Sequence, residues 1–488
     1  MNEPVPVAST KWTGASRILL AVILLAYVAL RCWKLTSYGL WFDEAFSLQA
    51  AQMSWGGMMS SIVADIVHPP LFYVVLKIWI AIGGASLLWL KLFSLLISIA
   101  TVVPLMLLCR ELRLSAAETN VAVFLVAVNA FLIHYAQELR MYSLLVFFSL
   151  WSFWLFVRWV RQTSTEWTML ICLTVANLLL VYTQYMGWLT IAAEGFYLLV
   201  WNRRKVVAFV LSGMAIVLCY LPWAYLIFHA SVVEGRGMGK FAAVLDQPRI
   251  RDVIWYLATL NGPFYFRRTT MLGVLLFGIP LLWWAWRSLN ERSNVFWLLG
   301  SLCFVTLLIN LIASYVLRPI WTERYLILTA IPYLILIAVA VLRLPSRVLR
   351  LPVLALILGW AGFSGIHMMQ RGNYRFNWMA LTRGMITAEE SDKTKVFVFE
   401  HHLEYPLQAS LAFLNNKRFD VVRVQRFEEL QGNHFWMAYR DSTWRREPPQ
   451  LFLKGHGCSI GNEVAVTSRA GTNSFEGETV TAFPVNCP

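Results

Sequence analysis

Two neighbouring carboxylates, Asp43 and Glu44, stand in the short stretch after the first long apolar segment of the chain. The surrounding residues predict the start of a helix, where the helix dipole and free N–H groups favour an ionised carboxylate that can act as a base or a ligand. Glu44 points to another side of that helix, so the two acids do not form a symmetric acid–base pair. Acidic residues in a first helical turn also serve as plain caps, and that alternative stays open.

Two further polar groups stand next to apolar segments. Asp65 and His68 precede a segment that begins with two prolines and includes Tyr73, and Arg324 and Tyr325 begin a much later one. Charged residues are costly at a membrane, so we expect these residues to do chemistry at one membrane face.

A third polar group lies where another apolar segment ends. His134, Glu138 and Tyr142 recur every four positions and are expected to share one helical face, while Arg140 lies on a different face and can bind an anion. An interfacial arginine paired with Glu138 explains the same pattern equally well.

The composition places these residues in a membrane protein. The chain of 488 residues is 58% hydrophobic and 15% aromatic, with a mean hydropathy of +0.59 and apolar runs along most of its length. A polytopic α-helical membrane protein is therefore predicted, with the bilayer as its main partner. The net charge of +14 is scattered at helix ends, which indicates membrane topology and anionic lipid and argues against a nucleic-acid partner.

The basic residues also predict the topology, because cytoplasmic connections are enriched in Lys and Arg. We expect a retained first helix and about 11 transmembrane helices, at roughly 15–34, 87–109, 118–137, 141–160, 166–184, 186–201, 206–228, 270–287, 295–316, 325–342 and 350–368. Residues 41–64 and 69–83 are then two amphipathic helices on the outer membrane face. An ordinary span at 70–82 is the alternative, but it would move most later basic clusters outside.

The polar composition after residue 370 predicts a second domain. We expect a transmembrane domain over 1–370 and a small external α/β domain over 371–488, with strands near 396–399 and 419–424 and helices near 403–415 and 427–431. Cys458 and Cys487 lie in this domain, and an oxidising compartment would favour a disulfide between them.

Other function classes fit less well. The glycine-rich segment 235–240 lacks the spacing of a Walker or Rossmann loop. A transporter or lipid flippase is the main alternative, yet the sequence shows no internal repeat and its acidic residues gather at one face. A non-catalytic membrane scaffold would leave the acidic, histidine and arginine positions unexplained.

The ordered motifs resemble those of bacterial family 39 glycosyltransferases, which belong to the GT-C superfamily with protein O-mannosyltransferases and lipid A aminoarabinose transferases. The resemblance covers about residues 15–370 and rests on four segments: Trp41-Phe42-Asp43-Glu44, His68-Pro69-Pro70-Leu71-Phe72-Tyr73, Ala136-Gln137-Glu138-Leu139-Arg140-Met141-Tyr142 and Glu323-Arg324-Tyr325. It implies an enzyme that moves a sugar from a polyprenyl-phosphate donor to a glycolipid, glycan or protein acceptor. It also implies a place in the bacterial cytoplasmic membrane, with the active site at the outer face. The topology expected from the basic residues puts the C-terminal domain on the same, periplasmic side.

The resemblance assigns roles at the matching positions. Asp43 matches the catalytic carboxylate, a general base that accepts the acceptor's proton, and Glu44 supports it; a single displacement would invert the anomeric carbon. His68, Arg140 and Arg324 match residues beside the donor phosphate. The further site candidates are Asp65, Tyr73, Glu138, Tyr142 and Tyr325.

A divalent metal is left open by the same motifs. Asp43 and Asp65 are the residues that could contribute to such a site, but Asp65 stands three positions before His68, where many relatives have the acid two positions before it or adjacent. No Cys/His spacing predicts structural zinc. Neither the donor sugar nor the acceptor is specified by these residues.

Overall fold

The computed structural model describes residues 12–163, 166–233, 247–262, 267–291, 294–317, 319–371, 376–441, 448–468 and 478–488. The chain forms two compact units. The helical unit comprises Met1–Trp33, Ser54–Val75 and Ser94–Met368, and the sheet unit comprises Lys34–Met53, Leu76–Phe93 and Met369–Pro488. The acidic motif thus belongs to the same unit as the C-terminal residues. The domain boundary near residue 370 remains a prediction. The glycine-rich segment 235–240 lies outside the described residues.

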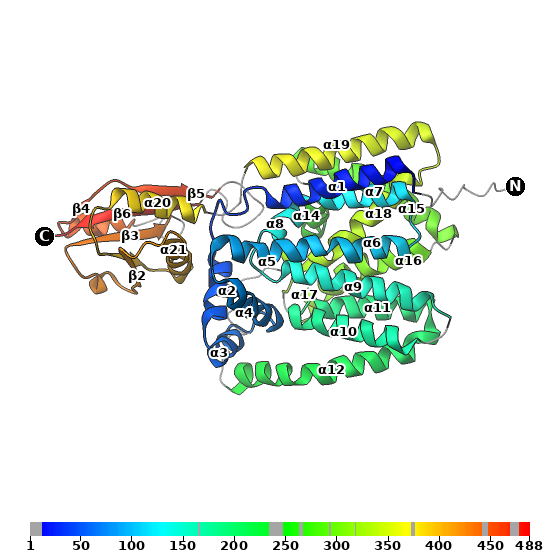
Figure 1. Cartoon of the computed structure of the whole chain (residues 1–488), viewed down its shortest axis with the longest axis horizontal. Helices are drawn as coiled ribbons and strands as arrows, with labels where there is room; N and C mark the ends of the chain where they lie inside the picture. Colours follow the sequence, from blue (N-terminus) through cyan, green and yellow to red (C-terminus); the bar gives the residue numbers. More distant parts are fainter. Residues whose placement is uncertain are drawn as a thin grey trace. The chain divides into compact units, whose positions relative to one another are not determined.

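Apolar helices make up the helical unit (Figure 1). They are α1 (Gly14–Cys32), α3 (Trp55–Asp65), α6 (Val102–Glu111), α7 (Ala116–Val128), α8 (Ala130–Ala136), α9 (Tyr142–Arg161), α10 (Trp167–Thr183), α11 (Gly187–Trp201), α12 (Val206–Phe228), α14 (Ile250–Leu260), α15 (Arg267–Glu291), α16 (Asn294–Gly300), α17 (Thr306–Val316), α18 (Ala330–Leu342) and α19 (Arg347–Arg371). Short 3₁₀ or π turns join them at η1 (Arg203–Lys205), η2 (His229–Val233), η3 (Ser301–Val305) and η4 (Glu323–Thr329). Two further helices, α4 (Leu71–Gly83) and α5 (Leu87–Ala100), are divided between the two units, and the last three residues of α19 also belong to the sheet unit.

The polytopic helical fold expected from the sequence is confirmed. Within the described residues, eight helices are long and apolar enough to cross a membrane, or nine if the bent pair α7 and α8 is one span. The expected spans at 166–184 and 186–201 form α10 and α11, which are shorter, with 17 and 15 residues. The helix α4 is also short, at 13 residues. The count of about 11 spans, and the assignment of α4 to the membrane surface, stay predictions.

The expected span 118–137 is broken by a bend of 60° between α7 and α8. Asn129 causes the break because its side-chain oxygen accepts a hydrogen bond from the Leu132 N–H (3.0 Å) and so begins a new helix. The break leaves carbonyls at the end of α7 without helical partners. Arg31 of α1, only 1% exposed, donates to two of them, on Val126 (3.2 Å) and Ala127 (3.1 Å).

The helix α18 lies at the centre of the helical unit. Its residues are apolar on every side, and those from Ala330 to Val341 are all buried. A helix that is apolar all round is stable only when other helices surround it. Its neighbours include α7, α15 and α16.

Three helices of this unit are joined by a buried ring of polar side chains. Ser152 of α9 lies 2.7 Å from the Glu194 carboxyl of α11 and 2.6 Å from the Asn177 amide oxygen of α10, and Asn177 donates to the other Glu194 oxygen (2.9 Å). The Ser152 hydroxyl has one proton and cannot donate to both oxygens. The ring closes when Glu194 carries a proton and donates it to Ser152, so a neutral acid fits this apolar setting.

The sheet unit contains a six-stranded sheet with the order β2-β1-β3-β6-β4 and with β5 paired to β6. The strands are β1 (Thr394–Val398), β2 (Phe419–Arg423), β3 (His434–Arg440), β4 (Ser459–Ile460), β5 (Val464–Thr467) and β6 (Thr479–Asn486). The strands β1, β2 and β3 run parallel, whereas β6 is antiparallel to β3. The helices of this unit are α2 (Phe42–Gln52), α20 (Trp378–Ala388), α21 (His401–Phe413), η5 (Phe427–Glu429) and α22 (Pro449–Gly455). The predicted small α/β domain is therefore present.

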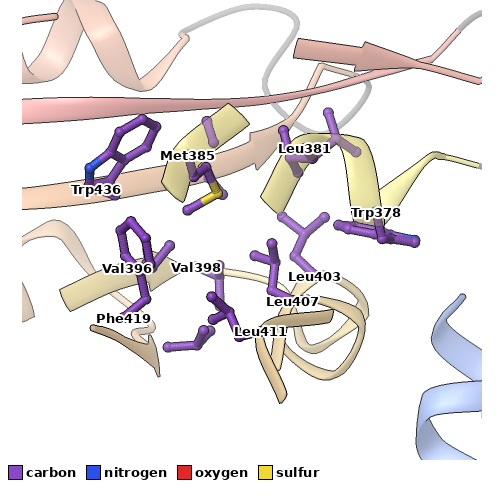
Figure 2. Packing of buried hydrophobic residues seen from close by; sticks show 14 residues of the cluster. Trp378, Leu381, Met385, Val396, Val398, Leu403, Leu407, Leu411, Phe419 and Trp436 are labelled. Carbon is purple, nitrogen blue, oxygen red and sulfur yellow. The ribbon is translucent and has the colours of Figure 1, made fainter. Parts of the chain in front are cut away.

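Alternating side chains of β1 give the sheet two apolar faces. Val396 and Val398 belong to the cluster formed with α20 and α21, which includes Trp378 and Leu407 (Figure 2). Phe397 belongs to the cluster on the other face. Cys458 and Cys487 border that second cluster and form a disulfide, as expected.

One expected helix is wrong in its extent. Residues 41–64 do not form a single helix, because the chain leaves the helical path at Met53 and Ser54 and starts again at Trp55. The Ser54 hydroxyl accepts a hydrogen bond from the Gly57 N–H (3.1 Å) and caps the second helix, α3.

Candidate functional site

His68 stands in the short link between α3 and α4. The helix α3 ends at Asp65 and is capped by Ile66, whose φ of 60° is rare for a β-branched residue. The Tyr185 hydroxyl donates to the Ile66 carbonyl (3.0 Å) and helps to hold this backbone. Strained backbone that is held in this way is common at functional sites. His68, two residues later, is 4% exposed.

Arg140 lies in the turn that joins α8 to α9. The expectation that His134, Glu138 and Tyr142 share one helical face is wrong, because residues 137–141 are not helical. Gln137 anchors this turn by donating to the Arg31 and Trp33 carbonyls, both at 2.8 Å.

The link and the turn bring His68 and Arg140 together. The Arg140 Nη2 lies 2.7 Å from the His68 Nε2, and both residues are buried. The ring of Tyr325 meets His68 edge-on, with 6.0 Å between ring centres. Arg324 lies with its guanidinium carbon 5.4 Å from the Tyr325 ring centre. We call His68, Arg140, Arg324 and Tyr325 the basic cluster.

The charge state of His68 follows from this setting. Burial lowers its pKa well below the usual value, and the charges of Arg140 and Arg324 lower it further. The ring is therefore neutral at physiological pH. Because a guanidinium can only donate, the Nε2 of His68 is the acceptor and its proton sits on Nδ1. Within the described residues, this buried Nδ1 has no hydrogen-bond partner.

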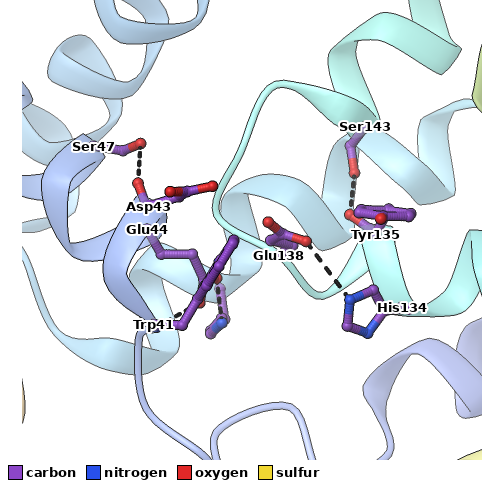
Figure 3. Close-up of polar contacts among 9 residues, drawn as sticks. Trp41, Asp43, Glu44, Ser47, His134, Tyr135, Glu138 and Ser143 are labelled. Atoms are coloured by element: carbon purple, nitrogen blue, oxygen red, sulfur yellow. Dashed lines mark hydrogen bonds and ion pairs between the residues drawn. The ribbon is translucent and has the colours of Figure 1, made fainter. Parts of the chain in front are cut away.

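Two other predicted residues adjoin the basic cluster. Tyr142 begins α9, is fully buried and interacts electrostatically with Arg324, Arg140 and Glu138. Its hydroxyl makes no hydrogen bond within the described part of the chain. Glu138 lies 3.8 Å from the His134 ring (Figure 3). Buried donors without partners are costly, so the two orphan groups indicate a ligand or ordered water here.

Asp65 and Tyr73 have a common neighbour that sequence reasoning missed. Asp65 is the half-buried last residue of α3, and Tyr73 is buried in α4. Both interact electrostatically with Tyr185, whose pKa is raised to about 12, mainly by burial. A single tyrosine between two apolar segments gives no sequence signal of this role.

The acidic motif begins α2 in the sheet unit. Glu44 is 2% exposed, and both its oxygens are engaged: one accepts from the Trp41 N–H (3.1 Å) and the other from the Lys91 ammonium (2.5 Å). Asp43 is half-buried, and its carboxylate points in a different direction from that of Glu44 (Figure 3). The Ser47 hydroxyl donates to the Asp43 carbonyl (2.7 Å).

Lys91 was missed by sequence reasoning, although a signal for it exists. A lone lysine in the apolar run of α5 is costly, and it predicts a buried acidic partner. A second lysine, Lys77 of α4, donates to the Ala51 (3.0 Å) and Met53 carbonyls at the other end of α2. The two lysines hold α2 at both ends.

No metal site emerges from the described residues. Among them, no three His, Cys, Asp or Glu side chains are grouped as metal ligands. We therefore assign no residue to a metal.

An aromatic-walled cavity of about 340 Å³ lies in the helical unit between the start of α11 and the end of α12. Its lining residues are Tyr185, Trp188, Tyr220, Trp223, Ala224, Ile227, Phe228, Ser231 and Val232. Trp223 donates to the Tyr185 hydroxyl (3.3 Å), and that hydroxyl also holds the backbone two residues before His68. The cavity wall is thus connected to the link that carries His68 of the basic cluster.

The fold has counterparts among solved structures, although no family model and no curated protein matches the chain. ArnT from Cupriavidus metallidurans bound to undecaprenyl phosphate is 14% identical over 97% of this chain and 98% of its own, with a TM-score of 0.55. The oligosaccharyltransferase of Archaeoglobus fulgidus in complex with zinc and sulfate is 13% identical over 80% of this chain and 61% of its own, with a TM-score of 0.51. Both are GT-C proteins.

This chain has a GT-C fold. The likeness to ArnT extends over nearly the whole length of both proteins, so it includes the sheet-containing C-terminal residues as well as the helices. The fold expected from the four short motifs is confirmed.

Proposed function

We propose that this chain is a glycosyltransferase of the family 39 type, which moves a sugar from a polyprenyl-phosphate donor to a glycolipid, glycan or protein acceptor. The observation that carries the proposal is the buried contact between Arg140 and His68, with Arg324 beside it. Arginine side chains and a neutral imidazole N–H form a donor set for a phosphate. The similar ArnT structure has undecaprenyl phosphate as its bound ligand.

The proposed reaction is a single displacement. An acceptor hydroxyl attacks the anomeric carbon and gives its proton to Asp43, while the bond from that carbon to the phosphate oxygen breaks. The electron pair leaves with the phosphate, whose growing charge Arg140 and Arg324 stabilise and to which the His68 Nδ1–H donates. The anomeric carbon is inverted.

The engagement of Glu44 supports Asp43 as the base. Both Glu44 oxygens already accept hydrogen bonds, one of them from a buried ammonium, so this carboxylate is held as a structural anion. Asp43 lies next to it in the first turn of α2, and its carboxylate is not part of that pair with Lys91.

We further propose that the enzyme works at the outer face of the bacterial cytoplasmic membrane. The basic clusters at alternate connections favour this orientation. The disulfide between Cys458 and Cys487 agrees with it, because disulfides persist in oxidising compartments. A transporter or flippase would need neither a base nor leaving-group stabilisation.

Binding of undecaprenyl phosphate tests the basic cluster. Arg140→Ala should weaken its binding to the purified chain in nanodiscs by roughly 10–150-fold, because a buried charge-assisted hydrogen bond contributes about 1.5–3 kcal/mol. Arg140→Lys should recover only part, since lysine lacks the planar fork. Arg158, at the other end of α9 and 5.6 Å from the Trp154 ring centre, supplies the matched control. Unchanged binding by Arg140→Ala would reduce Arg140 to an interfacial anchor and reopen the transporter alternative.

A further inference from the structure

The segment that leads into the acidic motif packs tightly against the C-terminal domain. Gly39 has a φ of 78°, and a β-carbon there would lie 3.1 Å from the Met379 side chain of α20 and 3.5 Å from the Ser410 hydroxyl of α21. Leu40, the next residue, is completely buried. Only glycine combines this backbone conformation with so close an approach.

An aromatic contact continues this packing at the first residue of α2. The Phe42 ring lies 4.1 Å from the His402 ring in an edge-on arrangement, and 5.7 Å from the Tyr405 ring, to which it is nearly parallel. His402 and Tyr405 belong to α21, the crossover helix between β1 and β2. The packing of α2 on α21 lies within one compact unit.

We propose that the C-terminal domain is a working part of the transferase, in which Tyr405 positions the first turn of α2 and therefore Asp43. This inference rests on the proposed function. Phe42 directly precedes Asp43, so a shift of the Phe42 ring moves the backbone that carries the carboxylate. The Lys91–Glu44 pair holds the same turn from α5. A displacement of the base by about 1 Å can lower the reaction rate roughly 100-fold. Even a small shift of the Phe42 ring is therefore expected to reduce sugar transfer.

The proposal explains why a domain without a catalytic motif is joined to the helical unit. The sheet supplies a rigid support, because α21 packs through Leu403, Leu407 and Leu411 on the apolar core under β1 and β2. A residue on a helix that is packed on a sheet fixes the position of its neighbour more accurately than a residue on a loop does.

Substitution of Tyr405 in the full-length chain tests the contact. The Tyr405→Ala variant, produced in a strain that lacks the gene for the unmodified chain, should transfer sugar at least tenfold less than the unmodified chain does. Hydrogen exchange of the α2 amides should speed up by a similar factor. Tyr405→Phe should restore both, because the stacked ring remains. Undecaprenyl phosphate binding should stay within about twofold in both variants, since Tyr405 lies outside the basic cluster.

Phe452→Ala is the matched control. Phe452 stacks on Phe427 at 4.0 Å between ring centres, beside the opposite face of the sheet. Its truncation should leave α2 exchange and transfer at parent levels. Gly39→Ala, which forces a β-carbon toward Met379, should resemble Tyr405→Ala.

Three results would overturn the proposal. They are normal transfer by Tyr405→Ala, an equal loss in Phe452→Ala, or failure of Tyr405→Phe to restore transfer. If the parent chain itself transfers no sugar, the proposed function fails. The exchange measurement then still decides whether Tyr405 holds α2, and unchanged exchange in Tyr405→Ala would reject the contact as well.

Discussion

Asp43 and Glu44 are neighbours to which we assign different tasks in the proposed reaction. Both oxygens of Glu44 accept hydrogen bonds, one from the Trp41 N–H and one from Lys91. We therefore expect the isosteric variants Asp43→Asn and Glu44→Gln to behave differently. An amide at 44 has one oxygen, so it can still accept from the Trp41 N–H but loses the charge pairing with Lys91, whereas an amide at 43 cannot take up a proton.

Asp43→Asn should therefore reduce transfer by roughly 10²–10⁴-fold, the usual contribution of a positioned base, with normal folding and donor binding. Glu44→Gln should reduce transfer less than Asp43→Asn does. The measurement is transfer from donor lipid extracted from a strain lacking this chain, with and without a chelator. Near-normal transfer by Asp43→Asn would remove the base from the mechanism, and an equal collapse of both variants, reversed by added metal, would favour a shared metal.

The residue types of the candidate site could be predicted from the sequence, but only some of the side chains that contact them could. His68, Arg140 and Arg324 were expected near a phosphate because they match family positions beside the donor phosphate, and the structure brings them together. Tyr185 and Lys91 were missed because their partners lie far away in the sequence and neither of the two residues belongs to a motif itself. Their roles emerge from packing, which one sequence does not reveal.

At the scale of elements, helix type and position were largely predictable from apolar runs, and the breaks were not. The break at Asn129 depends on a local side-chain cap and on Arg31 from another helix. The error at 137–141 has the same origin, since spacing by four presumes a helix that stops at Ala136. Capping is a weak signal beside a strong hydropathy pattern.

The ring of Ser152, Asn177 and Glu194 gives an element-scale prediction. Glu194→Gln should keep the stability of the chain, because an amide can donate to Ser152 and accept from Asn177. Glu194→Ala should lower it, since it leaves buried polar groups unpaired at about 1–3 kcal/mol each. Thermal unfolding in detergent measures both. Equal loss in the two variants would show that Glu194 is ionised in the folded chain.

A second element-scale prediction concerns pH and the C-terminal sheet. Burial acts to raise the pKa of Glu389, but hydrogen bonds from Ser391, His434 and Trp436 outweigh it and lower the pKa to about 2. Burial acts to lower the pKa of His434, and its contacts with Glu389 and Asn486 outweigh that and raise it. The Glu389 contribution to stability is present above about pH 4.5 and is lost as the pH falls toward 2. The His434 contribution is present below about pH 6.5 and is lost as the pH rises through its raised pKa.

The sheet should therefore be most resistant to proteolysis between about pH 4.5 and 6.5. His434→Gln should remove the decline above that range, whereas substitution of the exposed His456 by Gln should not. Limited proteolysis of the full-length chain during heating, repeated at several pH values, measures the resistance of the sheet. A flat profile in the parent would contradict the pairing.

At the scale of the whole molecule, topology is the central prediction. Residues 371–488 are expected outside and α4 is expected not to cross the membrane, because that arrangement keeps the basic clusters inside. Reporter fusions at Arg161 and Arg204 should report the cytoplasm, and one at Glu390, in the described part of the C-terminal domain, should report the outside. A cytoplasmic signal at Glu390 would remove the outer-face active site.

Arg31 has a consequence for the order of events during synthesis. Its partners on Ser98, Val126 and Ala127 are made 67, 95 and 96 residues later. At about 5–20 residues per second, the ribosome needs roughly 5–20 s to supply the last of them. We therefore expect the first helix to stay at the bilayer edge, with its arginine hydrated, until the end of α7 has emerged. A pause in translation before residue 127 should leave the first helix open to competing insertion factors or proteases.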